Sequence, residues 1–422
     1  VNTFQKSLER YAAVMHFNTP SNPTDDQILK TLSSLQNYDL VIVSIHKTNE
    51  SPSKNFGITA QAINLVNALQ EKKAVVLDVF ANPYSLNKFH GAENANAVIV
   101  SYQDRRFAEE SSAALIFGGV QSKGQLPITA SEHFILNDGL QTSEWVRLRY
   151  GSPEDVGINS EDLVQIGEIC NSGIADKAFP GCQVVVLKDG SMIYQESYGY
   201  HTYKKKQKVR NDDIYDLASI TKIAASTLSL MYLQDNGNIS LDYRLCDYIP
   251  EMVDSTPYQN MVLRDMMSHQ AGLVSWIPFY KKTLIKGMPR FDIYSQAKSE
   301  LYSHRVAEDF YIKTDYSDEI IRRILGTSIK TPGRYKYSDL GYYLIQKIIE
   351  KEVQMPLDSF VSQTFYQPMG LNTMGYKPRN RFELDRITPT EYDMLFRKQL
   401  VHGDVHDPGS AMLGGVGGHA GV

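Results

Sequence analysis

Short apolar segments that recur between helical stretches most constrain how the first third of this chain can fold. Three of them are strand-sized and rich in β-branched residues: Leu40–Ile45, Ala74–Phe80 and Ala97–Tyr102. Strands buried on both faces of a sheet require such nearly continuous apolar runs. Helical stretches at Ile58–Leu69 and Ala108–Ile116 separate them. The alternation predicts an α/β sandwich with a mainly parallel sheet and right-handed crossovers. It predicts no chemistry, because it contains no Gly-rich phosphate loop.

The pattern is interrupted at residues 135–159, where the chain becomes polar and loses its periodicity. Turn-forming residues, including Ser152-Pro153, lie in this stretch. We interpret residues 135–159 as a linker between a domain at 1–134 and a second domain at 160–422.

The second domain begins with a predicted β-hairpin and continues mainly as helices. Its strands are Cys182–Leu187 and Ser191–Tyr198, with an Asp-Gly turn at residues 189–190. Helices are predicted at Ser219–Leu233, Leu263–Ser268 and Leu340–Ile349. A strand pair followed by helices is typical of an α+β domain.

Charge and hydropathy exclude some partners. A net charge of −5 over 422 residues gives no electrostatic reason to expect nucleic acid or an anionic membrane. No apolar run approaches the ~20 residues that a membrane-spanning helix needs. The three cysteines form no CxxC pair and predict no disulfide framework. The chain starts at Val1 without a signal-like segment, so we expect either a removed targeting segment or an excised piece of a longer protein.

Ser219 and Lys222 are the strongest candidates for catalysis. Ser-x-x-Lys also occurs elsewhere, at Ser44/Lys47, Ser51/Lys54, Ser85/Lys88 and Ser295/Lys298. Only Ser219 and Lys222 begin a long apolar helix, where the i and i+3 side chains share one face. Partial burial would favour the neutral amine and make Lys222 a usable base, while the helix N-terminus would direct the Ser219 N–H at an oxyanion. The alternative is a helix-capping serine beside a surface lysine.

A second candidate motif, Tyr337-Ser338-Asp339, follows a Pro-Gly turn and leads into the predicted helix Leu340–Ile349. A tyrosine at such a junction can direct its hydroxyl into a cleft and relay a proton. The alternative is an ordinary surface tyrosine, in a chain that contains 26 tyrosines.

Several segments, in this order, resemble the class C β-lactamases and low-molecular-weight penicillin-binding proteins. They are Phe179–Val186, Ala218–Lys222, Gly237–Asp242, Tyr248–Glu251, Met267–Leu273 and Tyr335–Tyr343. The resemblance runs from about Asp155 to the end of the chain. It implies an α+β serine β-lactamase/transpeptidase-like domain that forms an acyl-enzyme on a cell-wall peptide, an ester or a β-lactam. It implies no metal or organic cofactor.

The resemblance also implies a role for each candidate residue. Ser219 would be the acylated nucleophile, Lys222 its proton acceptor and Tyr337 the proton shuttle to the leaving group. Asp339 would bind substrate where the family most often has Asn, and its acceptor-only carboxylate weakens the case for recognition of a β-lactam side-chain amide. His419, in a Gly-rich segment similar to one on the far wall of the family's cleft, would also bind substrate.

The family's third motif, Lys/His-Thr/Ser-Gly on a strand, is expected beyond Val422, so the domain is predicted to be incomplete at its C-terminus. The first third resembles the C-terminal α/β sandwich of family 3 glycoside hydrolases at Val79–Tyr84, Leu115–Val120 and Gly124–Thr129. That resemblance implies a catalytic barrel before Val1, of the kind found in β-N-acetylglucosaminidases, and a periplasmic or secreted parent protein. Two alternatives stay open: both domains are accessory to a glycosidase, or the second domain is a binding module without turnover.

Overall fold

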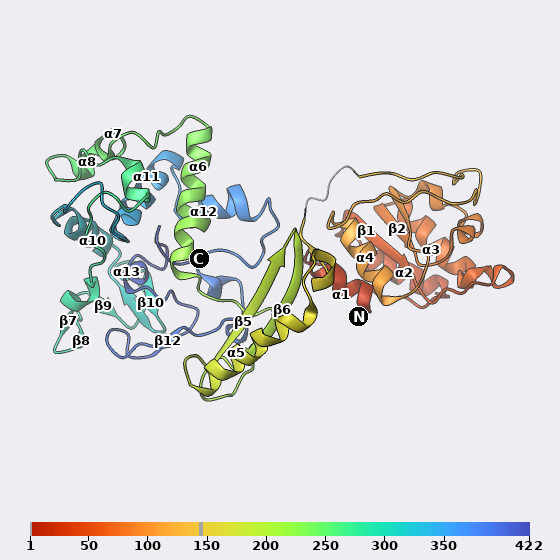
Figure 1. Ribbon diagram of the computed structural model, residues 1–422, viewed down its shortest axis with the longest axis horizontal. Helices are drawn as coiled ribbons and strands as arrows, with labels where there is room; N and C mark the ends of the chain where they lie inside the picture. The colour runs from red at the N-terminus through yellow and green to blue at the C-terminus, as the bar shows by residue number, and fades with distance from the viewer. Residues whose placement is uncertain (1, 143–146) are drawn as a thin grey trace. The chain divides into compact units, whose positions relative to one another are not determined.

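The computed structural model describes residues 2–142 and 147–422 of the chain (Figure 1). The chain divides into two compact units, residues 1–165 with 184–195 and residues 166–183 with 196–422. The predicted division at 135–159 stays a prediction, and residues 143–146 of that linker lie outside the described residues. Within the described residues, no helix is long and apolar enough to cross a membrane.

The first unit contains a three-stranded sheet of order β1-β2-β3, formed by β1 (Leu40–Ile45), β2 (Ala74–Val79) and β3 (Ala97–Val100). All pairings are parallel, as predicted, with Leu40 opposite Ala74 and Val76 opposite Ala97. The helices of this unit are α1 (Thr3–Glu9), α2 (Asp25–Ser34), α3 (Ala60–Gln70) and α4 (Arg106–Ile116). The side chains of Asn2, Thr24 and Thr59 accept hydrogen bonds from backbone N–H groups and so cap the first three helices at their N-termini.

The two faces of this sheet have separate apolar cores. One contains Val75, Leu77 and Val79 of β2 with side chains of α2 and α3. The other contains Phe80 with side chains of α1 and α4. Because successive strand residues point to opposite faces, helices cover both faces of the parallel sheet. The same alternation directs the Asp78 side chain toward α4, where the Ser112 hydroxyl donates a hydrogen bond to its carboxylate.

A hairpin follows α5 (Val164–Ala175) and consists of β5 (Gly181–Lys188) and β6 (Ser191–Gly199), in a sheet of order β4-β6-β5. Asp189 and Gly190 both have positive φ, +47° and +72°, which is the geometry that an Asp-Gly hairpin turn requires. The short strand β4 (Arg149–Tyr150) comes from the stretch predicted to be linker and pairs in parallel with β6. Part of that stretch is therefore integrated into a sheet.

Outside this hairpin, whose residues 184–195 belong to the first unit, the second unit is mainly helical. Its α-helices are α6 (Leu228–Asp235), α7 (Leu245–Tyr248), α8 (Pro250–Val253), α9 (Leu263–Met267), α10 (Tyr316–Leu325), α11 (Leu340–Val353), α12 (Leu357–Val361) and α13 (Pro408–Met412). Short strands form three small sheets: β7 (Leu284–Ile285) with β8 (Met288–Pro289), β9 (Tyr294–Ser295) with β11 (Phe310–Ile312) and β10 (His304–Ala307), and β12 (Glu391–Tyr392) with β13 (Leu400–Val401). The large core of this unit surrounds α11, whose apolar side chains are almost all buried.

The helix predicted at Ser219–Leu233 is present but is not α-helical throughout. It begins as a 3₁₀ turn at Ala218–Ile220, continues as a π-helix at Lys222–Thr227 and becomes the α-helix α6 only at Leu228. π-Helical turns inside longer helices are rare, and many of those that do occur lie at functional sites. Apolar periodicity predicts a helix but does not distinguish these hydrogen-bonding patterns.

Candidate active site

A strained turn presents Ser219 to solvent. Ala218, the preceding residue, has a φ of +47°, a conformation that is costly for a residue with a Cβ. Asp216 stabilises this turn, because one carboxylate oxygen accepts from the Ala218 N–H at 2.7 Å and the other from the His406 N–H at 2.7 Å. The Leu217 N–H donates to the Val422 carbonyl at 2.9 Å. The turn therefore has a defined geometry, and the Ser219 side chain lies at its exposed tip.

The side chains of Ser219, Lys222 and Tyr337 meet in a triangle of polar atoms. Lys222 Nζ donates to Ser219 Oγ at 2.9 Å and to the Tyr337 hydroxyl at 2.7 Å. The Tyr337 hydroxyl donates to Ser219 Oγ at 2.8 Å. Lys222 is only 4% exposed, whereas Tyr337 is 41% exposed and Ser219 is exposed. The sequence predicted these three residues as a group, and the structure brings them within hydrogen-bonding distance.

Lys222 is also surrounded by groups that complement an ammonium ion. Asp339 Oδ1 forms an ion pair with Lys222 Nζ at 2.6 Å. The His419 carbonyl accepts from the same nitrogen at 3.4 Å. The rings of Tyr337 and Tyr342 lie 4.9 and 5.5 Å from it, within the range of cation–π attraction. The predicted burial of Lys222 is observed, but its carboxylate neighbour was not predicted.

Backbone contacts fix the Tyr337-Ser338-Asp339 motif at the start of α11. Ser338 is buried, donates from Oγ to the Val274 carbonyl at 2.7 Å and accepts from the Leu340 N–H at 3.2 Å. The Asp339 N–H donates to the Ser275 carbonyl at 3.0 Å. The middle residue of the motif thus anchors it, while its two neighbours reach Lys222.

The His419 side chain does not reach this group of residues. It is 2% exposed, stacks on the Tyr343 ring with 4.3 Å between centroids, and contacts Asp407 Oδ1 through Nε2 at 2.8 Å. Burial opposes ionisation of Asp407, but the charge and hydrogen bond of His419 and the Ser410 N–H outweigh it and lower the Asp407 pKa to about 2. A role for His419 in substrate binding stays a prediction: its side chain contacts Asp407, and its carbonyl contacts Lys222.

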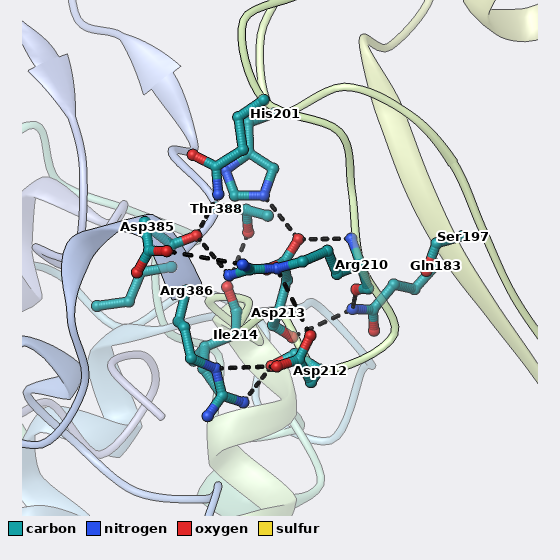
Figure 2. A network of polar contacts seen from close by, with 12 residues as sticks. Gln183, Ser197, His201, Arg210, Asp212, Asp213, Ile214, Asp385, Arg386 and Thr388 are labelled. Atoms are coloured by element: carbon teal, nitrogen blue, oxygen red, sulfur yellow. Dashed lines mark hydrogen bonds and ion pairs between the residues drawn. The ribbon is translucent and has the colours of Figure 1, made fainter. Parts of the chain in front are cut away.

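A polar network that sequence reasoning missed supports the segment leading to Ser219 (Figure 2). Asp213 is buried and accepts from the Arg210 N–H at 2.7 Å, and its Oδ2 lies 2.6 Å from His201 Nε2. Next to it, the Ile214 N–H donates to the Arg386 carbonyl at 2.7 Å, and the Thr388 N–H donates to the Ile214 carbonyl at 2.9 Å. The last two contacts tie Ile214, which lies five residues before the nucleophile, to residues 386–388. No motif spacing marks these two contacts, because their partners are about 170 residues apart.

Among the described residues, His46, Asp104 and Glu109 of the first unit lie close enough together to share a metal ion. Ordinary hydrogen bonds already account for the cluster: His46 Nδ1 lies 2.7 Å from Asp104 Oδ1, and Glu109 accepts from the Phe4 N–H at 2.8 Å. None of the three residues belongs to the Ser219 site.

Comparisons with known proteins assign this site to a family. The family model described as Beta-lactamase matches residues 166–420, more than half of the chain. A protein of Escherichia coli (strain K12) named "Putative D-alanyl-D-alanine carboxypeptidase" is 28% identical over 301 residues, covering 65% of this chain and 64% of that protein. An N-acetylmuramyl-L-alanine amidase of Bacillus subtilis (strain 168) is 26% identical over 293 residues, covering 64% of this chain and 61% of that protein. The match thus spans less than two thirds of the length of these relatives.

Among solved structures, an octameric penicillin-binding protein homologue from Pyrococcus abyssi has a TM-score of 0.45 and 21% identity, covering 62% of this chain and 53% of that one. This likeness is too low to carry an argument of its own. The family match carries the assignment, and it includes Ser219, Lys222, Tyr337, Asp339 and His419. This chain belongs to the β-lactamase family of serine hydrolases.

Proposed function

We propose that Ser219 is the nucleophile of an acyl-transfer reaction in which cell-wall peptides with D-amino acids, or related amides, are hydrolysed. The observation that carries this proposal is the triangle of Ser219 Oγ, Lys222 Nζ and the Tyr337 hydroxyl, with sides of 2.7–2.9 Å. A nucleophile within hydrogen-bonding reach of a base, with a third group that orients both, is the arrangement that activates a serine.

In the proposed acylation, the neutral amine form of Lys222 accepts the Ser219 hydroxyl proton at Nζ while Oγ bonds to the substrate carbonyl carbon. The Tyr337 hydroxyl delivers a proton to the leaving nitrogen and recovers one from Lys222. A water molecule then attacks the acyl-enzyme ester, its proton returns through the same pair, and Ser219 is restored. The backbone N–H of Ser219, at the start of the helix, supports the developing oxyanion.

The substrate class is inferred from two relatives, which are named "Putative D-alanyl-D-alanine carboxypeptidase" and "N-acetylmuramyl-L-alanine amidase". Esters and β-lactams are further members of the same acyl-donor class. Asp339 accepts hydrogen bonds but donates none when ionised, so it does not replace the amide donor of an Asn. We expect β-lactams to be the poorest of these substrates, although the resemblance is to the class C type.

The proposal is tested by a panel of four acyl donors: a peptide ending in D-alanyl-D-alanine, D-alanine amide, p-nitrophenyl acetate and a chromogenic cephalosporin. Turnover of the peptide or amide that disappears in Ser219→Ala supports it. Ser295→Ala is the matched control, because Ser295 is also in a Ser-x-x-Lys sequence of the second unit. No turnover of any donor by a folded protein would favour a binding module without catalysis.

For the first unit we propose an accessory α/β sandwich domain like that of family 3 glycoside hydrolases. The parallel sheet with helices on both faces supports this proposal, as do the segments that carry the resemblance. Among the described residues of this unit we can assign no sugar-cleaving pair of carboxylates, so it should release no sugar from aryl glycosides. Measurable release would show that the first unit has a catalytic centre. A cell-wall substrate also favours a periplasmic or extracellular location.

A further inference from the structure

His269 lies in the loop after α9 and is hydrogen-bonded to both neighbours of Tyr337. The Lys336 N–H donates to the His269 carbonyl at 2.8 Å. The Ser338 N–H donates to His269 Nδ1 at 3.3 Å. His269 itself has a φ of +59°, a left-handed conformation that costs a non-glycine residue free energy. The loop is therefore held in a strained conformation from which it contacts the backbone on either side of the proposed proton shuttle.

The imidazole ring also packs against the Tyr337 side chain. Its centroid lies 4.5 Å from that of Tyr337, and those of Tyr342 and Tyr335 lie at 5.8 and 6.0 Å. Tyr337 is 41% exposed, so few groups restrict its ring. Its hydroxyl must nevertheless stay within 2.8 Å of Ser219 Oγ and 2.7 Å of Lys222 Nζ. The His269 ring restricts the rotation of this exposed side chain.

The charge state of His269 is set by its surroundings. Burial, and then the positive charge of Lys222, lower its pKa, against the opposing effect of Asp339. The titratable groups that face it are thus Lys222 and Asp339, together with the phenols of Tyr335, Tyr337 and Tyr342. A lowered pKa keeps the ring neutral at pH 7. Because Nδ1 accepts from Ser338, the proton of the neutral ring is on Nε2.

We propose that neutral His269 is a positioning residue for Tyr337: it accepts the Ser338 N–H and packs against the phenol ring, so that the hydroxyl stays between Ser219 and Lys222. This inference rests on the proposed function and adds a regulatory consequence. Protonation puts a second N–H on Nδ1, directly against the Ser338 N–H, and adds a positive charge near Lys222. Acylation should therefore weaken in acid as His269 gains a proton.

His269→Asn separates the two roles of the side chain, because it keeps a hydrogen-bond acceptor for Ser338 but cannot gain a charge. Asn tolerates positive φ, and its Oδ1 can take the place of Nδ1 as the acceptor for Ser338. It does not titrate. His269→Ala removes both the acceptor and the ring. His304→Asn is the matched control, because His304 is another partly buried histidine of the second unit with a lowered pKa, in β10.

The measurement is the second-order rate constant for labelling by a fluorophosphonate, from pH 4.5 to 9, in the full chain with each substitution. We expect the parent rate to fall in acid at a pH below ~6.5, the ordinary His pKa, because the pKa of His269 is lowered. His269→Asn should stay within about tenfold of the parent at pH 8, while its acid limb shrinks; His269→Ala should lose more than ~10-fold at every pH. The control should keep the parent profile. Circular dichroism shows whether each variant is folded.

Equal pH profiles for the parent and His269→Asn, with His269→Ala also at the parent rate, would overturn the positioning role. An acid limb that persists unchanged in His269→Asn would assign it to Lys222 or Asp339 and would also contradict the inference. Failure of the proposed function is distinguishable, because in that case the parent protein itself would not be labelled at Ser219.

Discussion

Each unit of the chain buries a carboxylate, and the two respond to burial in opposite ways. In the first unit, burial of Asp78 in β2 raises its pKa to about 6, although hydrogen bonds from Ser112 and Ser101 oppose the rise. In the second unit, burial also disfavours the charge of Asp407, but His419 reverses the effect and lowers its pKa to about 2. Hydroxyl hydrogen bonds and the small effect of the His46 charge do not overcome the desolvation of Asp78, whereas the direct contact of His419 does so for Asp407.

The two units also differ in what surrounds their buried ionisable groups. The first unit buries a carboxylate with neutral hydroxyl partners and has no residue that we assign to catalysis. The second unit buries Lys222 among Asp339, two tyrosine rings and a backbone carbonyl, beside an exposed serine. In the second unit the ion pair between Lys222 and Asp339 offsets part of the desolvation cost of burying Lys222.

The largest effect is expected from removing the buried lysine of the second unit. Lys222→Ala should slow acylation by at least the ~10²-fold that is typical of losing a positioned general base. Tyr337→Phe should slow it less, because it keeps the ring and affects mainly proton delivery. The double variant should be far less than additive, since the residues act as one unit. Single-turnover acylation rates check this, and a folded Lys222→Ala protein at the parent rate would make Lys222 merely structural.

The next effect tests the paired carboxylate. Because the native pKa of Asp407 lies below that of an unfolded Asp, its contribution to stability is present above pH ~4 and lost as pH falls toward 2. Asp407→Asn keeps an acceptor for the Ser410 N–H but removes the charge that faces His419. The free energy of unfolding should fall by about 2–3 kcal/mol at pH 7, since one pKa unit is worth ~1.4 kcal/mol. Urea denaturation against the parent measures it; an unchanged midpoint would remove the ion pair from the account.

The same substitution in the first unit should have the opposite sign. The native pKa of Asp78 is above the unfolded value, so its contribution is complete below pH ~4 and is lost as pH rises through about 6. Asp78→Asn should therefore stabilise the first unit above pH 6, by up to about 2–3 kcal/mol, and flatten its pH dependence. Hydrogen exchange of the β2 amides in the full chain reports this locally. Faster exchange in the variant at pH 7 would contradict the predicted opposite signs of Asp78→Asn and Asp407→Asn.

The smallest change in stability is expected from removing a solvent-exposed ion pair. Arg264 and Asp242 form a two-bond ion pair at 2.7 and 3.1 Å, but both are exposed. Water and salt screen such pairs, and holding two long side chains costs entropy. Arg264→Ala should change the melting temperature little, and added salt should remove what change there is. A loss as large as that of Asp407→Asn would show that burial is not what distinguishes the two pairs.

Local patterns predicted part of the fold, although helices such as α2 and α10 were not predicted. The strands, the hairpin turn at Asp189-Gly190 and the helix at Leu340 follow from periodicity and turn chemistry, which depend on neighbouring residues. The π-helix after Lys222 was not predicted, because apolar spacing is similar for different helix types. Strand β4 was also missed, since two residues carry no readable alternation.

The candidate site was predicted in part, and the signal was the order of several motifs rather than local periodicity. Ser219, Lys222 and Tyr337 were found because several short segments occur in one order, which is more specific than any single spacing. The Lys222–Asp339 ion pair, the His201–Asp213 contact and the position of His269 depend on contacts between distant residues, and an isolated histidine or aspartate carries no spacing signal. His419 illustrates the converse: a Gly-rich context suggested a side chain in the cleft, whereas the ring packs inward on Tyr343.

The most direct test of the central claim is to locate an acyl-type label on the protein. The full chain is treated with a fluorophosphonate or a fluorescent penicillin, digested and mapped by peptide mass spectrometry, with Ser219→Ala and Ser295→Ala treated in parallel. The account predicts a single modified residue, Ser219, in the parent and in Ser295→Ala, and none in Ser219→Ala. A label on another serine, or a folded parent protein that neither probe modifies, would contradict it.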